Sequence, residues 1–220
     1  MKKHKLNADL ASPEDPNGLH FQTRQARAYD TLLPVYQSRL SLLQPVHGVV
    51  LDRVLDGFEC DLSVLEVGCG FGSSLQLIAK RGFCAEGIDM APEMVQAARR
   101  LSGCPVICGD FLQHEFSKRY HLVFAQAFVH LFPKAMACEV IRRLQSLALR
   151  RVFFSTSLAS RSSEGWEDKD GVVRYRSRYT VSEFMDLVEL STSGTPWRVE
   201  FFDLPDPLGK NWRDIILHHI

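Results

Sequence analysis

Two periodicities of apolar residues alternate along this chain from Leu62 onward. Short apolar runs bounded by turn residues predict strands, and apolar positions three or four residues apart predict the amphipathic helices between them. The predicted strands are Ser63 to Val67, Cys84 to Ile88, Val106 to Cys108, His121 to Ala125, Arg151 to Ser155, Arg198 to Leu204 and Asp214 to His218. The clearest helical stripes are Leu75-Ile78-Ala79, Met94-Ala98-Leu101, Ala137-Val140-Ile141-Leu144-Ala148 and, behind a Thr180 to Glu183 capping box, Phe184-Leu187-Val188.

Such alternation builds right-handed β-α-β units around a mostly parallel sheet. We therefore expect an α/β fold of the Rossmann-like, doubly wound type, with a seven-stranded sheet that binds its ligand beyond the carboxyl ends of the strands. The 220 residues, 45% of them hydrophobic, suffice for one large core but are few for two. Residues 21–220 are predicted to form a single domain.

Three segments flank or interrupt this alternation. Residues 1–20 contain two prolines, Asn17-Gly18 and scattered charges, which is typical of a flexible arm. Residues 21–58 have a helical pattern broken by Pro34 and Pro45, and predict a lid of two or three short helices. Residues 161–179 read as an insertion over the pocket, with a hairpin turn at Lys169-Asp170-Gly171.

Charge and cysteine content narrow the classes of function. Lys plus Arg and Asp plus Glu both total 26, so no overall field favours nucleic acid or an anionic membrane. No apolar run approaches membrane-spanning length, and polar residues follow the basic start where a signal peptide would need apolar ones. The six cysteines include no C-x-x-C pair, which predicts reduced thiols in a cytoplasmic protein without a metal site. We expect a monomer or a homodimer.

The run VLEVGCGFG, Val64 to Gly72, carries the main chemical signal. An apolar strand ends in a loop whose three glycines let backbone approach a ligand closely. Asp89 ends the next strand, where a carboxylate accepts hydrogen bonds from ribose hydroxyls. The third glycine comes one position earlier than in a G-x-G-x-x-G dinucleotide loop. Glu66 would repel a pyrophosphate but suits an ammonium or sulfonium group.

Four motifs in order resemble the class I S-adenosylmethionine-dependent methyltransferase family. They are Glu66 to Gly72, similar to the family's E-x-G-C-G-x-G loop, then Gly87 to Val95, Cys108 to Phe111 and Tyr120 to Pro133. The resemblance implies that S-adenosyl-L-methionine is the cofactor and residues 62–160 are the cofactor-binding core. The cofactor-binding residues that it implies are Glu66, Gly68, Cys69, Gly70, Gly72, Asp89, Met90, Asp110, Phe111 and Gln126. Ser146 to Arg151 departs from the Lys/Arg-Pro-Gly-Gly turn that is usual in the family.

The resemblance further implies transfer of a methyl group to oxygen or nitrogen of a small-molecule acceptor by in-line displacement. His130 follows the fourth strand and is the candidate catalytic acid-base residue. Structural alternatives stand beside these roles: Glu66 and Asp89 can bind their own loops, Asp110 can cap its turn, and His130 can pack under the cofactor. The rival functions are an NAD(P)-dependent oxidoreductase, a non-catalytic regulatory protein that binds S-adenosylmethionine, and a macromolecular methylase.

Candidate acceptor-binding residues lie in the N-terminal helices and in the insertion. Tyr29 can close over the ligand, and Trp166 and Tyr179 can line the acceptor pocket. Arg176 lies at the centre of an alternating basic run whose side chains share one face of a strand, formed with Arg174 and Arg178. This strip either recognises an acidic acceptor or, as we favour, pairs across the hairpin with acids on the first arm: Glu164, Glu167, Asp168 and Asp170.

Overall fold

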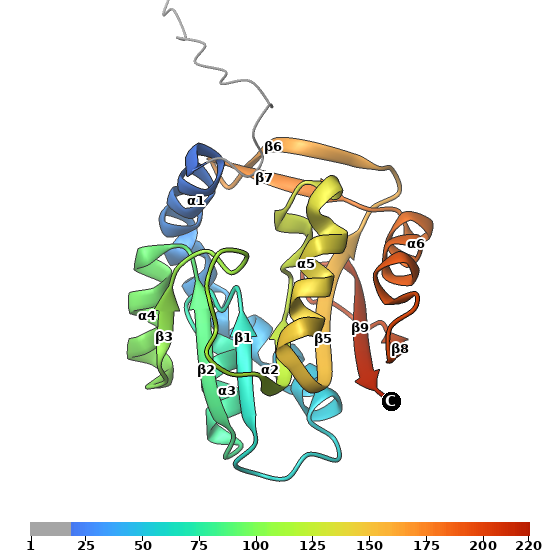
Figure 1. Cartoon of the computed structure of the whole chain (residues 1–220). Coiled ribbons are helices and arrows are strands. Elements are labelled where there is room, and N and C mark those ends of the chain that lie inside the picture. Colours follow the sequence, from blue (N-terminus) through green and yellow to red (C-terminus); the bar gives the residue numbers. More distant parts are fainter. Residues whose placement is uncertain (1–18) are drawn as a thin grey trace, which may run out of the picture.

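The computed structural model describes residues 19–220, so nearly all of the predicted arm lies outside the described residues. Seven strands form one sheet in the order β3-β2-β1-β4-β5-β9-β8, with helices on both of its faces (Figure 1). The strands are β1 (Ser63–Val67), β2 (Cys84–Asp89), β3 (Val106–Cys108), β4 (Tyr120–Ala125), β5 (Ala148–Leu158), β8 (Trp197–Phe202) and β9 (Asn211–His219). The predicted seven-stranded α/β fold is confirmed.

Strand direction and order place the ligand-binding edge. β1 to β5 are parallel, and β9 runs antiparallel to β5 and to β8. From β1 the chain moves outward through β2 to β3, then returns to the other side of β1 for β4 and β5. In open sheets of this type the crevice forms where the strand order reverses, beyond the carboxyl ends. Here that point lies between β1 and β4.

The helices cover the sheet in two layers. They are α1 (Leu19–Ser38), α2 (Leu40–Val54), α3 (Ser73–Lys80), α4 (Pro92–Ser102), α5 (Lys134–Leu147) and α6 (Val181–Thr192), with a short 3₁₀ turn η1 (Val129–Leu131). The apolar faces of α2, α3 and α4 pack on one side of the sheet, and those of α5 and α6 on the other. Among residues 19–220, no helix has both the length and the apolar character needed to cross a membrane.

The N-terminal helices correct one prediction. α1 runs through Pro34 and α2 through Pro45, and the chain breaks only at Arg39 between them. Both prolines are exposed, so the carbonyl groups that lose a helical partner face water, and neither ring meets packed core. The second half of α2, from Val50 to Val54, packs in the core. α1 extends over the edge of the sheet that binds ligand (Figure 1), and the first part of α2 also reaches this edge.

The junction between α5 and β5 corrects a second prediction. α5 ends at Leu147 and β5 begins at Ala148, so Ala148 is a strand residue and not the last member of a helical stripe. Ala148 is fully buried. A buried apolar residue fits a helix and a strand equally well, so periodicity could not separate them here. The helix passes into the strand without a loop, at the place where the Lys/Arg-Pro-Gly-Gly turn is missing.

The insertion forms a hairpin apart from the main sheet. β6 (Ser163–Lys169) pairs antiparallel with β7 (Val172–Arg178). Asp170 and Gly171 between them have φ values of 54° and 79°, and positive φ at both positions is what a type I′ turn requires. The predicted hairpin and its turn are confirmed. In Figure 1 the hairpin lies across the carboxyl ends of the parallel strands and reaches α1.

Candidate functional site

A cavity of about 270 Å³ lies at the carboxyl ends of the parallel strands. Its wall comes from the loops after β1, β2, β3 and β4, from α1, α2 and β7, and from the segment that leads into β9. All of the predicted cofactor-binding residues except Gly72 line it. The position agrees with the reversal of strand order, because the cavity extends to both sides of the β1–β4 pair.

The glycine loop shows why each small residue stands where it does. Gly70 has φ +53, and a Cβ atom built there meets nothing within 4 Å, so the loop leaves open space on the cavity side. Gly72 differs, because its Cβ would lie 2.8 Å from Cα of Ala98 on α4. Gly72 therefore allows α3 to pack closely against α4. The structure places it in helix packing and not at the cavity wall.

Asp89 holds its own loop while it lines the cavity. Its Oδ2 accepts from the backbone N–H of Gly70 at 2.8 Å, and its Oδ1 accepts from that of Ala91 at 2.9 Å. Burial raises the pKa of Asp89, although these hydrogen bonds oppose the shift. A carboxylate offers about four acceptor positions, so two backbone bonds leave capacity for a ligand. The structural and the ligand-binding interpretations of Asp89 are therefore compatible.

Glu66 has an unsatisfied charge-bearing atom. Its side chain lines the cavity but is buried, with 4% of the residue exposed. Among the described residues, Oε2 has no hydrogen-bond partner. Burial, and then the charge of Asp89, raise the pKa of Glu66 well above its usual range. An unpaired buried carboxylate is costly, so a positively charged group bound in the cavity would relieve this carboxylate.

Asp110 and Gln126 follow β3 and β4 and carry further acceptor groups. Asp110 accepts from the backbone N–H of Leu112 at 3.0 Å, which is the predicted turn-capping alternative. Its Oδ2 also accepts from Nε2 of Gln22 on α1 at 2.6 Å. Gln126 accepts from Oγ of Ser74 at 3.2 Å. Asp110 therefore has two partners in the fold and Gln126 has one, and both residues line the cavity.

The sequence did not single out the residues that tie α1 to the rest of the site. The Gln25 amide donates to the carbonyl of Tyr175 at 3.0 Å and accepts from its N–H at 2.8 Å, so it pairs with β7 as a neighbouring strand would. Asp30 accepts from the backbone N–H groups of Glu93 and Met94, at 2.9 and 3.2 Å, and so caps α4 from outside. The available signal was a set of polar residues on the inward face of a predicted helix.

His130 lies over the other half of the sheet. It is 4% exposed, and its Nδ1 is 3.3 Å from Oγ1 of Thr156 on β5. Burial lowers the pKa of His130 well below its usual range, and the cations of Arg176 and Arg174 lower it further. The imidazole is therefore neutral at neutral pH. His130 lines the cavity, as does Trp212, whose ring centroid is 6.0 Å away.

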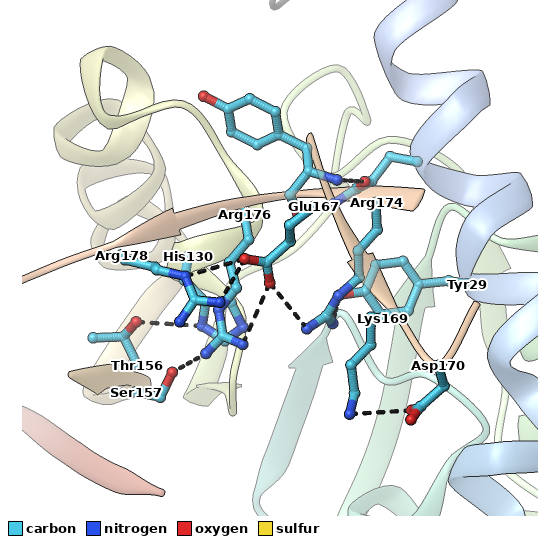
Figure 2. A network of polar contacts seen from close by, with 12 residues as sticks. Tyr29, His130, Thr156, Ser157, Glu167, Lys169, Asp170, Arg174, Arg176 and Arg178 are labelled. Carbon is cyan, nitrogen blue, oxygen red and sulfur yellow. Dashed lines mark hydrogen bonds and ion pairs between the residues drawn. The ribbon is translucent and has the colours of Figure 1, made fainter. Parts of the chain in front are cut away.

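The arginines of β7 pair across the hairpin, but with only one of the four predicted acids (Figure 2). Arg174, Arg176 and Arg178 share one face of the strand and converge on Glu167. The other three predicted partners do not pair with the arginines. Strand alternation explains part of this correction, because Glu164 and Asp168 point to the opposite face of β6 from Glu167. The remaining acid, Asp170, lies in the turn and pairs with Lys169 and Arg39.

The predicted acceptor-binding residues separate into two groups. Tyr29 and Arg176 line the cavity. Trp166 does not: it is on the hairpin face away from the arginines, where its ring packs on Phe21 and under the guanidinium of Arg24. Tyr179 is buried beside Phe184, because the chain turns into α6 at this point. Alternation along β6 removes Trp166 from the pocket, and the turn into α6 removes Tyr179.

Neither a metal cluster nor a disulfide is found in residues 19–220. No group of three or more His, Cys, Asp or Glu side chains is arranged to hold a metal ion in this part of the chain. The cysteines are free thiols. The polar groups of the cavity in the described chain are carboxylates, amides, hydroxyls, arginines, one lysine and two histidines, His47 and His130, whose pKa values burial lowers.

Comparison with known proteins agrees with this architecture. Residues 64–148 match the family model for a methyltransferase domain. A demethylmenaquinone methyltransferase of Tropheryma whipplei is 38% identical over 76 residues, which are 34% of this chain and 30% of the relative. A malonyl-[acyl-carrier protein] O-methyltransferase of Priestia megaterium is 24% identical over 112 residues, 49% of this chain and 39% of the relative. The chain thus aligns with well under half of the length of these curated relatives.

Solved structures show the same fold over most of the chain. The 1,6-didemethyltoxoflavin-N1-methyltransferase of Burkholderia thailandensis superposes with a TM-score of 0.71 and 13% identity, covering 97% of this chain and 93% of its own. The magnesium protoporphyrin IX methyltransferase of Synechocystis PCC 6803 superposes with a TM-score of 0.62 and 18% identity, and the superposition covers 80% of this chain and 79% of that enzyme. At sequence identities this low, the similarity shows a shared fold and no more. Residues 64–148 therefore match the methyltransferase domain family, and the chain has the fold of class I S-adenosylmethionine-dependent methyltransferases.

Proposed function

We propose that this protein is an S-adenosyl-L-methionine-dependent methyltransferase that acts on oxygen or nitrogen of a small molecule. The observation that carries the proposal is the buried Oε2 of Glu66, unpaired among the described residues, beside a glycine loop that leaves space in the cavity. A carboxylate in this position fits a cationic ligand and opposes a pyrophosphate. The match of residues 64–148 to a methyltransferase domain supports the same ligand.

The residues around the cavity suit the parts of this cofactor. Bound there, S-adenosylmethionine supplies a methyl group on a positively charged sulfur, which is the leaving group in an in-line displacement. We propose that Asp89 accepts from the ribose hydroxyls, that Asp110 and Phe111 bind adenine, and that Glu66 faces the cationic end. Structures titled as complexes with S-adenosylhomocysteine, including that of the Burkholderia enzyme with its small-molecule substrate, support this assignment.

His130 is the proposed proton acceptor for the methyl acceptor. Because burial and nearby cations lower its pKa, the imidazole is uncharged at neutral pH and has a lone pair available. We expect His130→Ala to lower product formation, while the affinity for S-adenosylhomocysteine stays within about twofold. Unchanged turnover would assign His130 to packing beneath the ligand.

The domain divisions follow from the same proposal. Residues 62–160 would bind the cofactor, the insertion 161–179 would cover the acceptor, and within the predicted lid 21–58 α1 and the first part of α2 would close the site. A monomer or homodimer and a cytoplasmic location remain predictions. Light scattering during size-exclusion chromatography would establish the oligomeric state.

Calorimetry with S-adenosylhomocysteine, and separately with NAD⁺ and NADPH, tests the proposed function. We expect binding of the first ligand only, weakened about tenfold or more in Glu66→Gln because a charge-assisted contact is lost. Incubation with methyl-labelled cofactor and a metabolite extract then measures transfer. Binding of the dinucleotides alone would establish the oxidoreductase alternative. Cofactor binding without transfer to any extract would establish the regulatory one.

A further inference from the structure

Charge is divided along the cavity. Three acids, Glu66, Asp89 and Asp110, end or follow β1, β2 and β3, whereas Arg176 and Lys210 line the cavity on the side of β5 and β9, and Arg174 lies between this side and α1. The Arg176 guanidinium donates to Oγ of Ser157 on β5. β1 and β5 are separated by β4, and two strand spacings amount to about 10 Å. The basic end is therefore set apart from the carboxylates proposed to bind the cofactor.

The basic end contains two buried arginines that the fold pairs only in part: Nη1 of Arg174 donates to the hydroxyl groups of Tyr29 and Tyr36 at 2.9 and 3.2 Å, but other donors stay free among the described residues. The Arg174 and Arg176 side chains are 5% and 10% exposed, and among the described residues the Nε of each has no hydrogen-bond partner. The Oε2 of Glu167 accepts from Nη2 of Arg178 at 2.6 Å, which leaves Oε1 at 3.8 and 3.9 Å from Arg174 and Arg176. Those two distances are too long for hydrogen bonds. Figure 2 shows the three guanidinium groups around this one carboxylate.

Other charged residues at this end do not cancel the excess of positive charge. Lys210 adds a cation, although burial lowers its pKa to about 8. Asp206 also lines the cavity, but it accepts from the backbone N–H of Leu208 at 2.6 Å and from the Trp212 indole. Burial raises the pKa of Asp214 to about 7, so this carboxyl is partly uncharged at neutral pH.

We infer that the buried guanidinium groups of Arg174 and Arg176 anchor an oxyanion of the methyl acceptor, so that the acceptor is a small organic acid. Guanidinium forks match the planar oxygens of a carboxylate and the oxygens of a phosphate or phosphonate. A neutral acceptor would leave the two Nε–H groups unpaired and the positive charges unbalanced. This inference rests on the proposed methyltransferase function and names the substrate class of the same site.

A competing occupant is the carboxylate of the cofactor's own methionine group. The spacing across β4 opposes it, because Glu66 and the glycine loop lie in the other half of the cavity. The two occupants differ in a measurable way. If the arginines hold the acceptor, their replacement leaves affinity for S-adenosylhomocysteine unchanged. If they hold the cofactor, that affinity falls.

The experiment uses the full chain saturated with S-adenosylhomocysteine, which cannot donate a methyl group. A metabolite extract is split by anion exchange into retained and unretained fractions, and compounds that stay with the protein on ultrafiltration are identified by mass spectrometry. Phosphatase treatment of the retained fraction separates phosphate monoesters from carboxylates and phosphonates. The variants are Arg176→Gln, Arg176→Lys and the control Arg178→Gln. The control removes the same charge from the same strand and from the same Glu167 partner, but Arg178 is not among the cavity-lining residues.

We expect compounds from the anionic fraction to stay with the wild type, and Arg176→Gln to weaken their retention about tenfold or more. Arg176→Lys should keep part of the wild-type retention of these compounds, and Arg178→Gln should keep nearly all of it. The inference would be overturned if the protein bound compounds only from the fraction that passes through the anion exchanger, or bound none from either fraction. An equal effect of the control would also overturn it, as would a tenfold loss of S-adenosylhomocysteine affinity in Arg176→Gln confirmed as folded by its thermal transition. Failure of the wild type to bind S-adenosylhomocysteine would instead refute the proposed function.

Discussion

Replacement of Asp89 by alanine separates the two tasks of this carboxylate. In the fold, Asp89 accepts from the N–H groups of Gly70 and Ala91. Each such bond contributes about 0.5–1.5 kcal/mol, so Asp89→Ala should lower the free energy of unfolding by roughly 1–3 kcal/mol. For a chain of this length that is a fall in Tm of about 2–12 °C.

The same change removes the proposed acceptors of two ribose hydroxyls. We expect this to weaken S-adenosylhomocysteine binding by about 2–3 kcal/mol, or roughly 30- to 150-fold in Kd. Isothermal calorimetry at a temperature well below the unfolding transition measures this loss of affinity while the protein stays folded. Asp89→Asn keeps one acceptor oxygen and should give intermediate values for both quantities.

The outcome that refutes the reasoning is specific. If Asp89→Ala lowers Tm as calculated but leaves the Kd for S-adenosylhomocysteine within about twofold, Asp89 serves only its own loop, and the ribose assignment is wrong. Asp186→Ala is the matched control, because it removes an exposed carboxylate from α6 on the side of the sheet away from α4. It should change neither quantity.

Three further changes test other parts of the structure. Gly72→Ala should lower the free energy of unfolding in urea by about 3 kcal/mol, because the added Cβ meets Ala98 and φ at this position is +86. Gly209→Ala is the control and should cost only about 1 kcal/mol, because φ is +70 there but the space is open. Equal losses would contradict the packing role of Gly72. Gln25→Ala should speed hydrogen exchange of the Tyr175 amide, to which the Gln25 side chain is bonded, without affecting β1 or β4; unchanged exchange would show that α1 is held elsewhere. Burial raises the pKa of Asp214 from 3.8 to about 7, so the folded state binds this proton more tightly and unfolding free energy should fall as pH rises from about 4 to 7. Asp214→Asn should flatten that part of the pH profile, and an unaltered slope would disprove the assignment.

The sequence by itself determined the sheet and the loop at its centre. Strand periodicity, the glycines after β1 and the acid at the end of β2 are local patterns, and a parallel sheet brings the carboxyl ends of its strands to one edge. Hence Glu66, Asp89 and Asp110 could be placed at one cavity before any contact was known. Local patterns did not decide that Gly72 serves the packing of α3 against α4, or that α1 runs through Pro34.

Only the tertiary structure decided what closes the cavity and which charges face it. Gln25 pairs with Tyr175 across 150 positions of the chain, and Glu167 lies 2.6 Å from Arg178 but 3.9 Å from Arg176. Alternation along β7 predicted that the arginines share a face, but not that this face turns toward the cavity. Such contacts depend on where separately formed elements meet, and periodicity within one element contains no information about its neighbours in space.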